Sequence, residues 1–101
     1  IDSLVAGGCI ISGATVKRSL LFSSVYVHSW ATVEDSVILP GADIGRHAVL
    51  KRCVVDKQCR IPEGMQIGVD PEADRQRFHV SPKGITLVTA EMLGQGAAET
   101  H

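Results

Sequence analysis

Aliphatic residues recur along the first two thirds of the chain at intervals of five or six positions. When the sequence is aligned with itself at a shift of 17 residues, these positions fall into three columns, the third starting with a shift of 16. Self-similarity of this kind is the signature of a repeat architecture. The columns are Ile10, Val27, Ile44 and Ile61; Val16, Val33, Leu50 and Ile67; and Val5, Leu21, Ile38 and Val55.

The residues two positions before each column member are nearly all small. Side chains alternate between the two faces of a strand, so these residues should point inward as well. The spacing lacks the 3.6-residue period of an amphipathic helix. It predicts an all-β fold, a parallel β-helix of nearly four coils over residues 1–69 with three short strands per coil. The small residues are Gly8, Val25, Ala42 and Cys59; Ala14, Ala31, Ala48 and Met65; and Ser3, Ser19, Ser36 and Cys53.

Residues 70–101 have a different pattern and are predicted to form a capping tail of the same domain. Asp70 before Pro71 is a good helix start, because aspartate caps the first turn and proline suits the first helical position. A helix is therefore expected over residues 71–78. A solenoid needs its open end covered, and we expect the tail to cover the last coil.

The rest of the tail predicts a turn, a strand and a short terminal helix. "SPKG" at 81–84 has turn chemistry, and residues 85–88 should form a strand with Val80 close enough to pair. Thr89 can cap a helical turn over residues 91–93, and the remaining residues, 94–101, should fray.

The composition and charge of the chain argue against a nucleic-acid-binding protein and against a membrane protein. Hydrophobic residues make up 45% of the chain but aromatics only 4%, which suits a narrow interior of small aliphatic side chains. A net charge of -1 gives no basic field for nucleic acid, and no apolar run approaches the roughly 20 residues that span a bilayer. We expect neither a nucleic-acid nor a membrane partner.

The cysteines and the opening residues predict a cytoplasmic location. Cys9, Cys53 and Cys59 are odd in number and form no CxxC pair, so we expect them to be reduced core residues without a metal. The opening residues lack a basic signal region. The first residue is Ile1 and not Met, so we expect the chain to be part of a longer protein.

Two motifs invite a catalytic interpretation. "AGGCIISG" at 6–13 is rich in glycine, but it lacks the Gly-Lys-Ser/Thr ending of a phosphate loop and leads into strands, so tight coil corners explain it better. His28 and His47 should be exposed or at a corner, where hexapeptide acyltransferases place a general base. No accompanying acid is readable in the sequence.

Basic residues gather in the third and fourth coils, and they have two interpretations. One is a solvated, ion-paired surface, because Asp43, Asp56 and Glu63 are close in sequence. The other is a site for the phosphate of an effector, formed by Lys57 with Arg52 or Arg60 and completed by another domain. The basic residues are Arg46, Lys51, Arg52, Lys57 and Arg60.

An apolar ladder is expected on one outer face of the β-helix. Residues that flank an inward position point outward, and those around the third column are apolar apart from Asp56. The ladder predicts a docking surface; the alternative is that the tail folds back along it. Its members are Leu4, Leu20, Phe22, Val37, Leu39 and Val54.

Four segments resemble the C-terminal domain of bacterial ADP-glucose pyrophosphorylase (glucose-1-phosphate adenylyltransferase). They are "SLVAGGCIISGA" at 3–14, "SVILPGADIGRHAVLKRCVVDK" at 36–57, "IPEGMQIGVDPEADRQRF" at 61–78 and "GITLVTAEML" at 84–93. The resemblance implies a left-handed β-helix that serves as an oligomerisation and allosteric-regulation domain in glycogen biosynthesis. It also implies a separate N-terminal catalytic domain that uses ATP and Mg²⁺, so this chain should bind no cofactor and be non-catalytic in isolation.

The resemblance further implies partners and an effector. The expected partners are the enzyme's own catalytic domain, other subunits of a homotetramer, and a sugar-phosphate or nucleotide effector. Lys57 matches a position that is basic in family members with a known effector pocket. Enteric members carry arginines where this chain has Ala90 and Gly94, so its effector response should differ from theirs. The alternatives are a small hexapeptide-repeat acyltransferase and the β-helix domain of another sugar nucleotidyltransferase.

Overall fold

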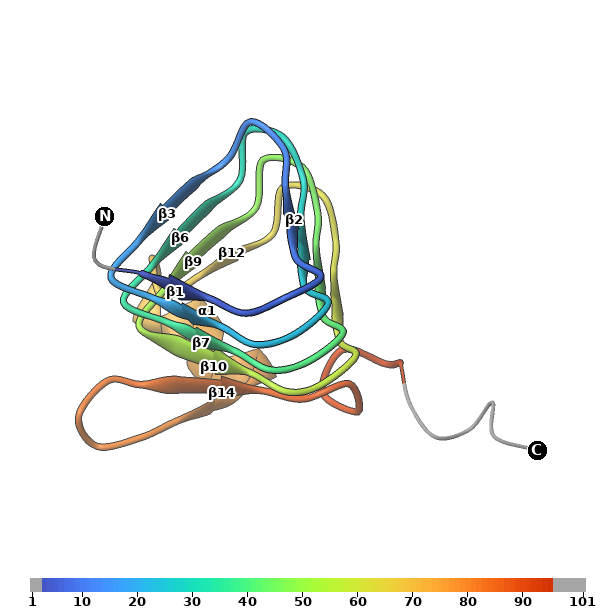
Figure 1. Ribbon diagram of the computed structural model, residues 1–101. Helices are drawn as coiled ribbons and strands as arrows, with labels where there is room; N and C mark the ends of the chain where they lie inside the picture. Colours follow the sequence, from blue (N-terminus) through green and yellow to red (C-terminus); the bar gives the residue numbers. More distant parts are fainter. Residues whose placement is uncertain (1–2, 96–101) are drawn as a thin grey trace.

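Short strands wind the chain into a triangular prism, seen end-on in Figure 1. This structure is a computed structural model and describes residues 3–95. The strands of the solenoid are β1 (Leu4–Val5), β2 (Ile10–Ile11), β3 (Thr15–Lys17), β4 (Leu20–Leu21), β5 (Tyr26–Val27), β6 (Thr32–Glu34), β7 (Val37–Ile38), β8 (Asp43–Ile44), β9 (Val49–Lys51), β10 (Cys53–Val55), β11 (Arg60–Ile61) and β12 (Gln66–Ile67).

Each side of the prism is a parallel sheet made of every third strand. One sheet has the order β11-β8-β5-β2, another β12-β9-β6-β3, and the third contains β1-β4-β7-β10. From the N-terminal end, the path from β1 through β2 to β3 turns counter-clockwise as it recedes, so the solenoid is left-handed (Figure 1). The predicted left-handed parallel β-helix of about four coils is confirmed.

The three predicted columns fill the interior, with one correction in the first coil. Val27, Ile44 and Leu50 are completely buried, as the repeat predicts. However, Ile11 and not Ile10 pairs with Val27, and Ile10 points outward with 53% of its surface exposed. The first coil is one residue shorter than the uniform 17-residue alignment assumes. For the same reason Cys9, and not Gly8, packs against the core.

The corners place residues in the left-handed backbone region, where most side chains are strained. Glycine avoids this strain, but more than half of the corner residues with positive φ are not glycine. The first corner has Gly8, Ser24, Gly41 and Gln58; the second has Gly13, Trp30, His47 and Gly64; the third has Arg18, Asp35, Arg52 and Gly68.

A column of serines satisfies buried backbone groups beside the third corner. The backbone N–H of Ser36 donates to Oγ of Ser19 over 3.1 Å, and that of Cys53 donates to Oγ of Ser36 over 3.2 Å. Each hydroxyl in turn donates to a carbonyl oxygen two residues earlier, at 2.8 Å. Small inward residues are therefore needed here for hydrogen bonding as well as for space.

The tail begins with the predicted helix and returns to the solenoid as a strand. Helix α1 (Pro71–Arg77) is capped by Asp70, whose Oδ1 accepts from the backbone N–H of Glu72. Strand β13 (His79–Val80) pairs antiparallel with β14 (Thr86–Val88), which pairs in parallel with β10. The tail therefore adds a rung to the third sheet, giving the order β1-β4-β7-β10-β14-β13, and Val88 extends the third inward column.

The predicted terminal helix over residues 91–93 is wrong. Residues 90–94 form a turn, in which the backbone N–H of Gln95 donates to the carbonyl of Ala90 over 2.8 Å. Gly94 has φ +75, which closes the turn before a second turn can form. The expected fraying of residues 94–101 falls mostly outside the described residues. Among residues 3–95, no helix has the length and apolarity needed to cross a membrane.

Candidate functional site

An apolar ladder runs along the outside of the third sheet. Backbone pairing aligns Leu4 with Leu20, Leu20 with Val37, Val37 with Val54, and Val54 with Leu87 of the tail. Leu4 is 70% exposed and Leu20 39%, whereas Val37 and Val54 are half-buried between their neighbours. The tail lengthens this ladder with Leu87 and does not cover it, so the alternative that the tail lies across this face is wrong for the described residues.

Phe22 and Leu39 form a second row at the end of the same face. Their backbone N–H groups donate to Ile38 and Val55, so they follow the inward residues of successive rungs. Phe22 is 43% exposed. Together the two rows, which we call the apolar face, include the six positions predicted from the sequence. A cavity of about 270 Å³ opens at its N-terminal end, lined by Leu4, Val5, Ala6, Leu20, Leu21 and Phe22.

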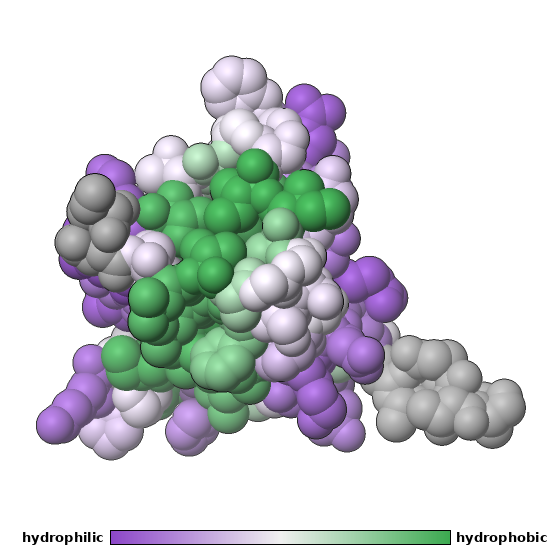
Figure 2. Space-filling view, in the orientation of Figure 1, coloured by the Kyte–Doolittle hydropathy of each residue, from purple (hydrophilic) through white to green (hydrophobic). Residues whose placement is uncertain are grey.

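The N-terminal end of the solenoid is also apolar, which the sequence analysis did not predict. Val5, Ile10 and Ile11 are 47%, 53% and 39% exposed. Figure 2 shows hydrophobic side chains gathered over the end formed by β1, β2 and β3. Val5 and Ile11 are inward residues of the first described coil, whereas Ile10 points outward beside them.

The predicted effector residues do not all lie together. Arg52 and Lys57 lie at opposite ends of β10, about 16 Å apart along an extended chain. Lys57 lies beside the first corner and lines a shallow cavity of about 330 Å³ with Ser23, Ser24, Pro40, Gly41 and Gln58. Arg60 is nearer to Lys57 in the chain, but its backbone N–H and C=O are both bound by the side-chain amide of Gln95.

Arg52 belongs to a charged column at the third corner. Arg18 and Asp35 occupy the same corner in the preceding coils, and Nε of Arg18 donates to Oδ1 of Asp35 over 2.7 Å. The Arg18 hydrogen bond, aided by the positive charge of Arg52, lowers the pKa of Asp35 below its usual value. The ion pair at this corner joins Arg18 and Asp35, whereas neither Arg52 nor Lys57 forms an ion pair among residues 3–95.

The two histidines lie on or beside the outer face of the sheet β11-β8-β5-β2 and stack on aromatic rings. His28 stacks on Tyr26 with ring centroids 3.8 Å apart, and its Nε2 lies 2.9 Å from Oδ1 of Asp43. This acid partner was missed in the sequence, although Asp43 lies one coil below Tyr26 in the repeat. His47 stacks more loosely on Trp30, at 6.3 Å, at the second corner.

The cysteines act as small core residues. Cys53 and Cys59 are buried, and burial raises the pKa of each thiol to about 11. A thiol with such a pKa is almost fully protonated at neutral pH and is a poor nucleophile. The described residues contain no group of three or more His, Cys, Asp or Glu side chains that could hold a metal ion.

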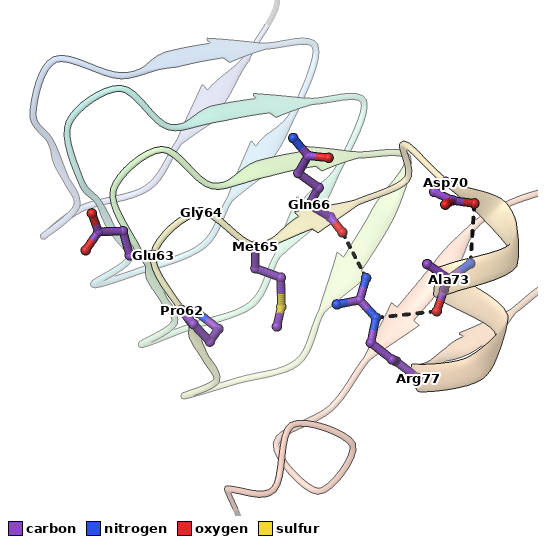
Figure 3. Close-up of a pocket in the computed structure, with 8 residues that line it drawn as sticks. All are labelled: Pro62, Glu63, Gly64, Met65, Gln66, Asp70, Ala73 and Arg77. Carbon is purple, nitrogen blue, oxygen red and sulfur yellow. Dashed lines mark hydrogen bonds between the residues drawn. The ribbon is translucent and has the colours of Figure 1, made fainter.

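A broad depression of about 580 Å³ separates the last coil from α1 (Figure 3). Arg77 reaches across it from the helix and donates to the carbonyl oxygen of Gln66 over 3.0 Å. Its Nε donates to the carbonyl of Ala73 over 3.4 Å. Arg77 thus holds α1 against β12, and we assign the depression a structural role.

The fold defines a hexapeptide-repeat β-helix domain. The chain belongs to the family described as GlmU-like, C-terminal hexapeptide, whose family model matches residues 1–88. It is 87% identical over 99 residues to a glucose-1-phosphate adenylyltransferase of Dechloromonas aromatica. It is also 62% identical over 96 residues to a glucose-1-phosphate adenylyltransferase of Nitrosomonas europaea.

These two matches cover 98% and 95% of this chain but only 22% of each relative. The chain therefore spans about a fifth of the length of these curated relatives. The predicted resemblance to the C-terminal domain of bacterial glucose-1-phosphate adenylyltransferases is confirmed.

Proposed function

We propose that this chain is the non-catalytic C-terminal domain of a glucose-1-phosphate adenylyltransferase and that it docks through its apolar face. In such an enzyme, ATP and glucose 1-phosphate give ADP-glucose and pyrophosphate for glycogen synthesis in the bacterial cytoplasm. The catalytic residues, with the ATP and Mg²⁺ that they use, would lie in the much larger part of the relatives that this chain does not match.

The observation that carries this proposal is the continuity of the apolar face. Leu4, Leu20, Val37, Val54 and Leu87 align rung by rung from the first coil to the tail. The outer faces of the other two sheets are mixed, with Asp43 and Arg60 on one and Lys17 and Glu34 on the other. A contiguous apolar patch of this length marks an interaction site in a soluble protein.

The energy available from covering the face is large enough for a stable contact. A patch of several hundred Å² covered at ~25 cal/mol per Å² contributes on the order of 10 kcal/mol before ordering costs. The catalytic domain or a neighbouring subunit of a homotetramer would cover it. Such a contact would link effector binding near Lys57 to the catalytic domain, since only Asp56 separates Lys57 from the end of β10 in the same sheet.

The test places two charges on the face in the full-length enzyme. Leu20→Glu and Leu39→Glu together should leave the coil core intact, because both side chains point outward, but should disrupt subunit association. Thr15→Glu with Thr32→Glu is the matched control. It adds the same two charges to the outer face of a different sheet, β12-β9-β6-β3, in which Thr15 of β3 pairs with Thr32 of β6.

Sedimentation velocity should show a smaller species for the leucine double variant and an unchanged assembly for the threonine double variant. Circular dichroism establishes that both remain folded. A leucine double variant that sediments and turns over like the parent enzyme would show that the apolar face is not a docking surface.

A further inference from the structure

The residues after β14 turn back and bind the last strand of another sheet, β11-β8-β5-β2. In this turn the backbone N–H groups of Leu93 and Gln95 both donate to the carbonyl oxygen of Ala90, over 3.1 and 2.8 Å. The side-chain amide of Gln95 then binds the backbone of Arg60 in β11. Its Oε1 accepts from the N–H over 2.9 Å, and its Nε2 donates to the carbonyl oxygen over 2.6 Å. We call residues 89–95 the strap.

The backbone groups of Arg60 point toward the C-terminal end of the solenoid. Those of its neighbours point the other way, because the carbonyl oxygens of Cys59 and Ile61 accept from the N–H groups of Asp43 and Gly45 in the preceding coil, both over 2.8 Å. Successive residues of a strand in a parallel sheet bond alternately to the two neighbouring strands. The N–H and C=O of Arg60 are therefore the groups that a further coil would bind, and at the edge of a sheet such groups are open to another strand.

One side chain is sufficient to close this edge. Two positions after Arg60 the chain has Pro62, which carries no backbone N–H. Two positions before it, the N–H of Gln58 donates to the carbonyl oxygen of Pro40 in the preceding coil over 2.9 Å. The edge of β11 therefore offers the single N–H of Arg60 with its carbonyl oxygen, and a primary amide supplies the matching acceptor and donor. Gln95 thus makes the two hydrogen bonds that a residue of a further strand would make.

The other two sheets end on parts of the tail that belong to a strand pair and a helix. Strand β14 pairs with β10, and β13 pairs with β14. Beside β12, Arg77 of α1 donates to the carbonyl oxygen of Gln66 over 3.0 Å, and Asp74 of α1 accepts from the N–H of Gly68 over 2.8 Å. The strap differs from both, because its hydrogen bonds to β11 come from one side chain.

A buried thiol lies beside the strap. Cys59 of the last coil is completely buried, and its Sγ lies 3.8 Å from the carbonyl oxygen of Val88, the residue before the strap. Within the strap, Ala90 and Leu93 are half-buried and pack against the hydrophobic core. Cys53, by contrast, lies in β10, which is flanked by β7 and β14. Lifting the strap would therefore uncover Cys59 and leave Cys53 buried.

We propose that residues 89–95 form a strap that opens and closes over the end of the solenoid, and that the side-chain amide of Gln95 holds it closed. In the open state the strap leaves β11 and Cys59 becomes accessible, while β14 stays paired with β10. The inference goes beyond the proposed function and does not rest on it, because every group involved belongs to this chain.

The strap also completes the hold of the tail on the corner that contains Lys57. On one side of this corner the carbonyl oxygen of Val88 accepts from the N–H of Asp56 over 2.8 Å. On the other side Gln95 binds both backbone groups of Arg60. Opening the strap releases the Arg60 side alone, so the corner gains freedom at one end and keeps its other support.

The experiment removes the amide of Gln95 in the 101-residue chain and follows amide hydrogen exchange by NMR at neutral pH. In Gln95→Ala, exchange at the Arg60 amide should be about tenfold faster or more, as expected for the loss of two hydrogen bonds. The Asp56 amide, which β14 holds, should exchange as in the parent. Glu91→Ala is the matched control, because it removes a side chain of the same length from an exposed position in the same turn. It should leave both amides unchanged.

Labelling of the thiols with iodoacetamide, followed for each cysteine by peptide mass spectrometry, measures the opening itself. In Gln95→Ala the labelling rate of Cys59 should rise about tenfold, in step with exchange at Arg60. The rate of Cys53 should not change. Gln95→Glu should lie between the parent and Gln95→Ala in both measurements. Its carboxylate can accept from the N–H of Arg60 but cannot donate to the carbonyl oxygen.

Three results would overturn the proposal. The first is unchanged exchange at Arg60 in Gln95→Ala. The second is faster exchange at Arg60 without faster labelling of Cys59, since the amide would then cap an edge over which nothing moves. The third is equal acceleration at Asp56 and Arg60, which would show that the whole tail opens as one body. The labelling rate of Cys53 verifies that each variant keeps the solenoid folded.

Discussion

The tail strand should contribute to stability as a rung of the solenoid, and Val88→Ala tests this. Val88 is completely buried and pairs with Val55 at the end of the third inward column. Its backbone carbonyl accepts from the N–H of Asp56 over 2.8 Å. Leu87, the residue before it, points outward and is 37% exposed. Leu87→Ala is therefore a matched control in the same strand.

The expected magnitudes follow from burial. Val88→Ala removes two buried carbon groups, about 1.6 kcal/mol at ~0.8 kcal/mol each. The cavity that remains brings the total to about 2–3 kcal/mol. Leu87→Ala removes three carbons, but from a partly exposed position, and should cost about 1 kcal/mol or less. The variant that loses fewer atoms should thus lose more stability.

Urea unfolding at 25 °C measures both free-energy changes, and amide hydrogen exchange localises them. If the tail opens as a separate unit, a loss of about 2.5 kcal/mol speeds exchange at the Asp56 amide by roughly 50- to 100-fold. Amides of the earlier coils, such as that of Tyr26, should be affected less. The reasoning is refuted if Val88→Ala costs no more than Leu87→Ala and leaves the Asp56 amide as protected as before.

Three further predictions concern single positions. Gly64→Ala should cost about 1 kcal/mol in urea unfolding, because Gly64 has φ +76 while the space around its Cβ position is empty, so only backbone strain opposes alanine; an unchanged midpoint would contradict this. In the full-length enzyme, Lys57→Ala should raise the concentration of effector for half-activation about tenfold and leave basal turnover nearly unchanged, and an unaltered activation curve would reject the assignment of Lys57. The pKa of Asp35 is lowered from 3.8 by its hydrogen bond with Arg18, so the stabilisation is present above pH 3.8 and is lost as the pH falls through the folded-state pKa. Urea midpoints of the parent and Asp35→Asn should therefore converge in acid, and a constant difference from pH 7 to pH 2 would disagree.

The amino-acid sequence alone determined the solenoid and its inward columns. A period of 17 residues with small partners two positions earlier leaves few ways to bury aliphatic side chains, and a strand alternates them between two faces. The apolar face followed from the same alternation, because Leu20 and Val37 flank inward positions. Helix α1 was readable from Asp70 and Pro71, since helix starts depend on local hydrogen bonding.

Only the tertiary structure decided features that depend on how one coil stacks on the next. Ile11, and not Ile10, pairs with Val27 because a corner of the first coil is one residue shorter than the corresponding corner of the next coil. Both residues are isoleucine, so side-chain chemistry could not tell which of them points inward. Corner residues such as Trp30 and Gln58 adopt positive φ because the neighbouring coils impose it, although their own preference is against it.

The contact between Gln95 and Arg60 also required the folded chain. The two residues are 35 positions apart in the sequence, and no short motif unites them. Arg52 and Lys57, by contrast, are five residues apart in the sequence but lie at opposite ends of a strand. Sequence proximity predicts local hydrogen bonds and alternation, whereas the side chains that share a site are determined by the packing of distant segments.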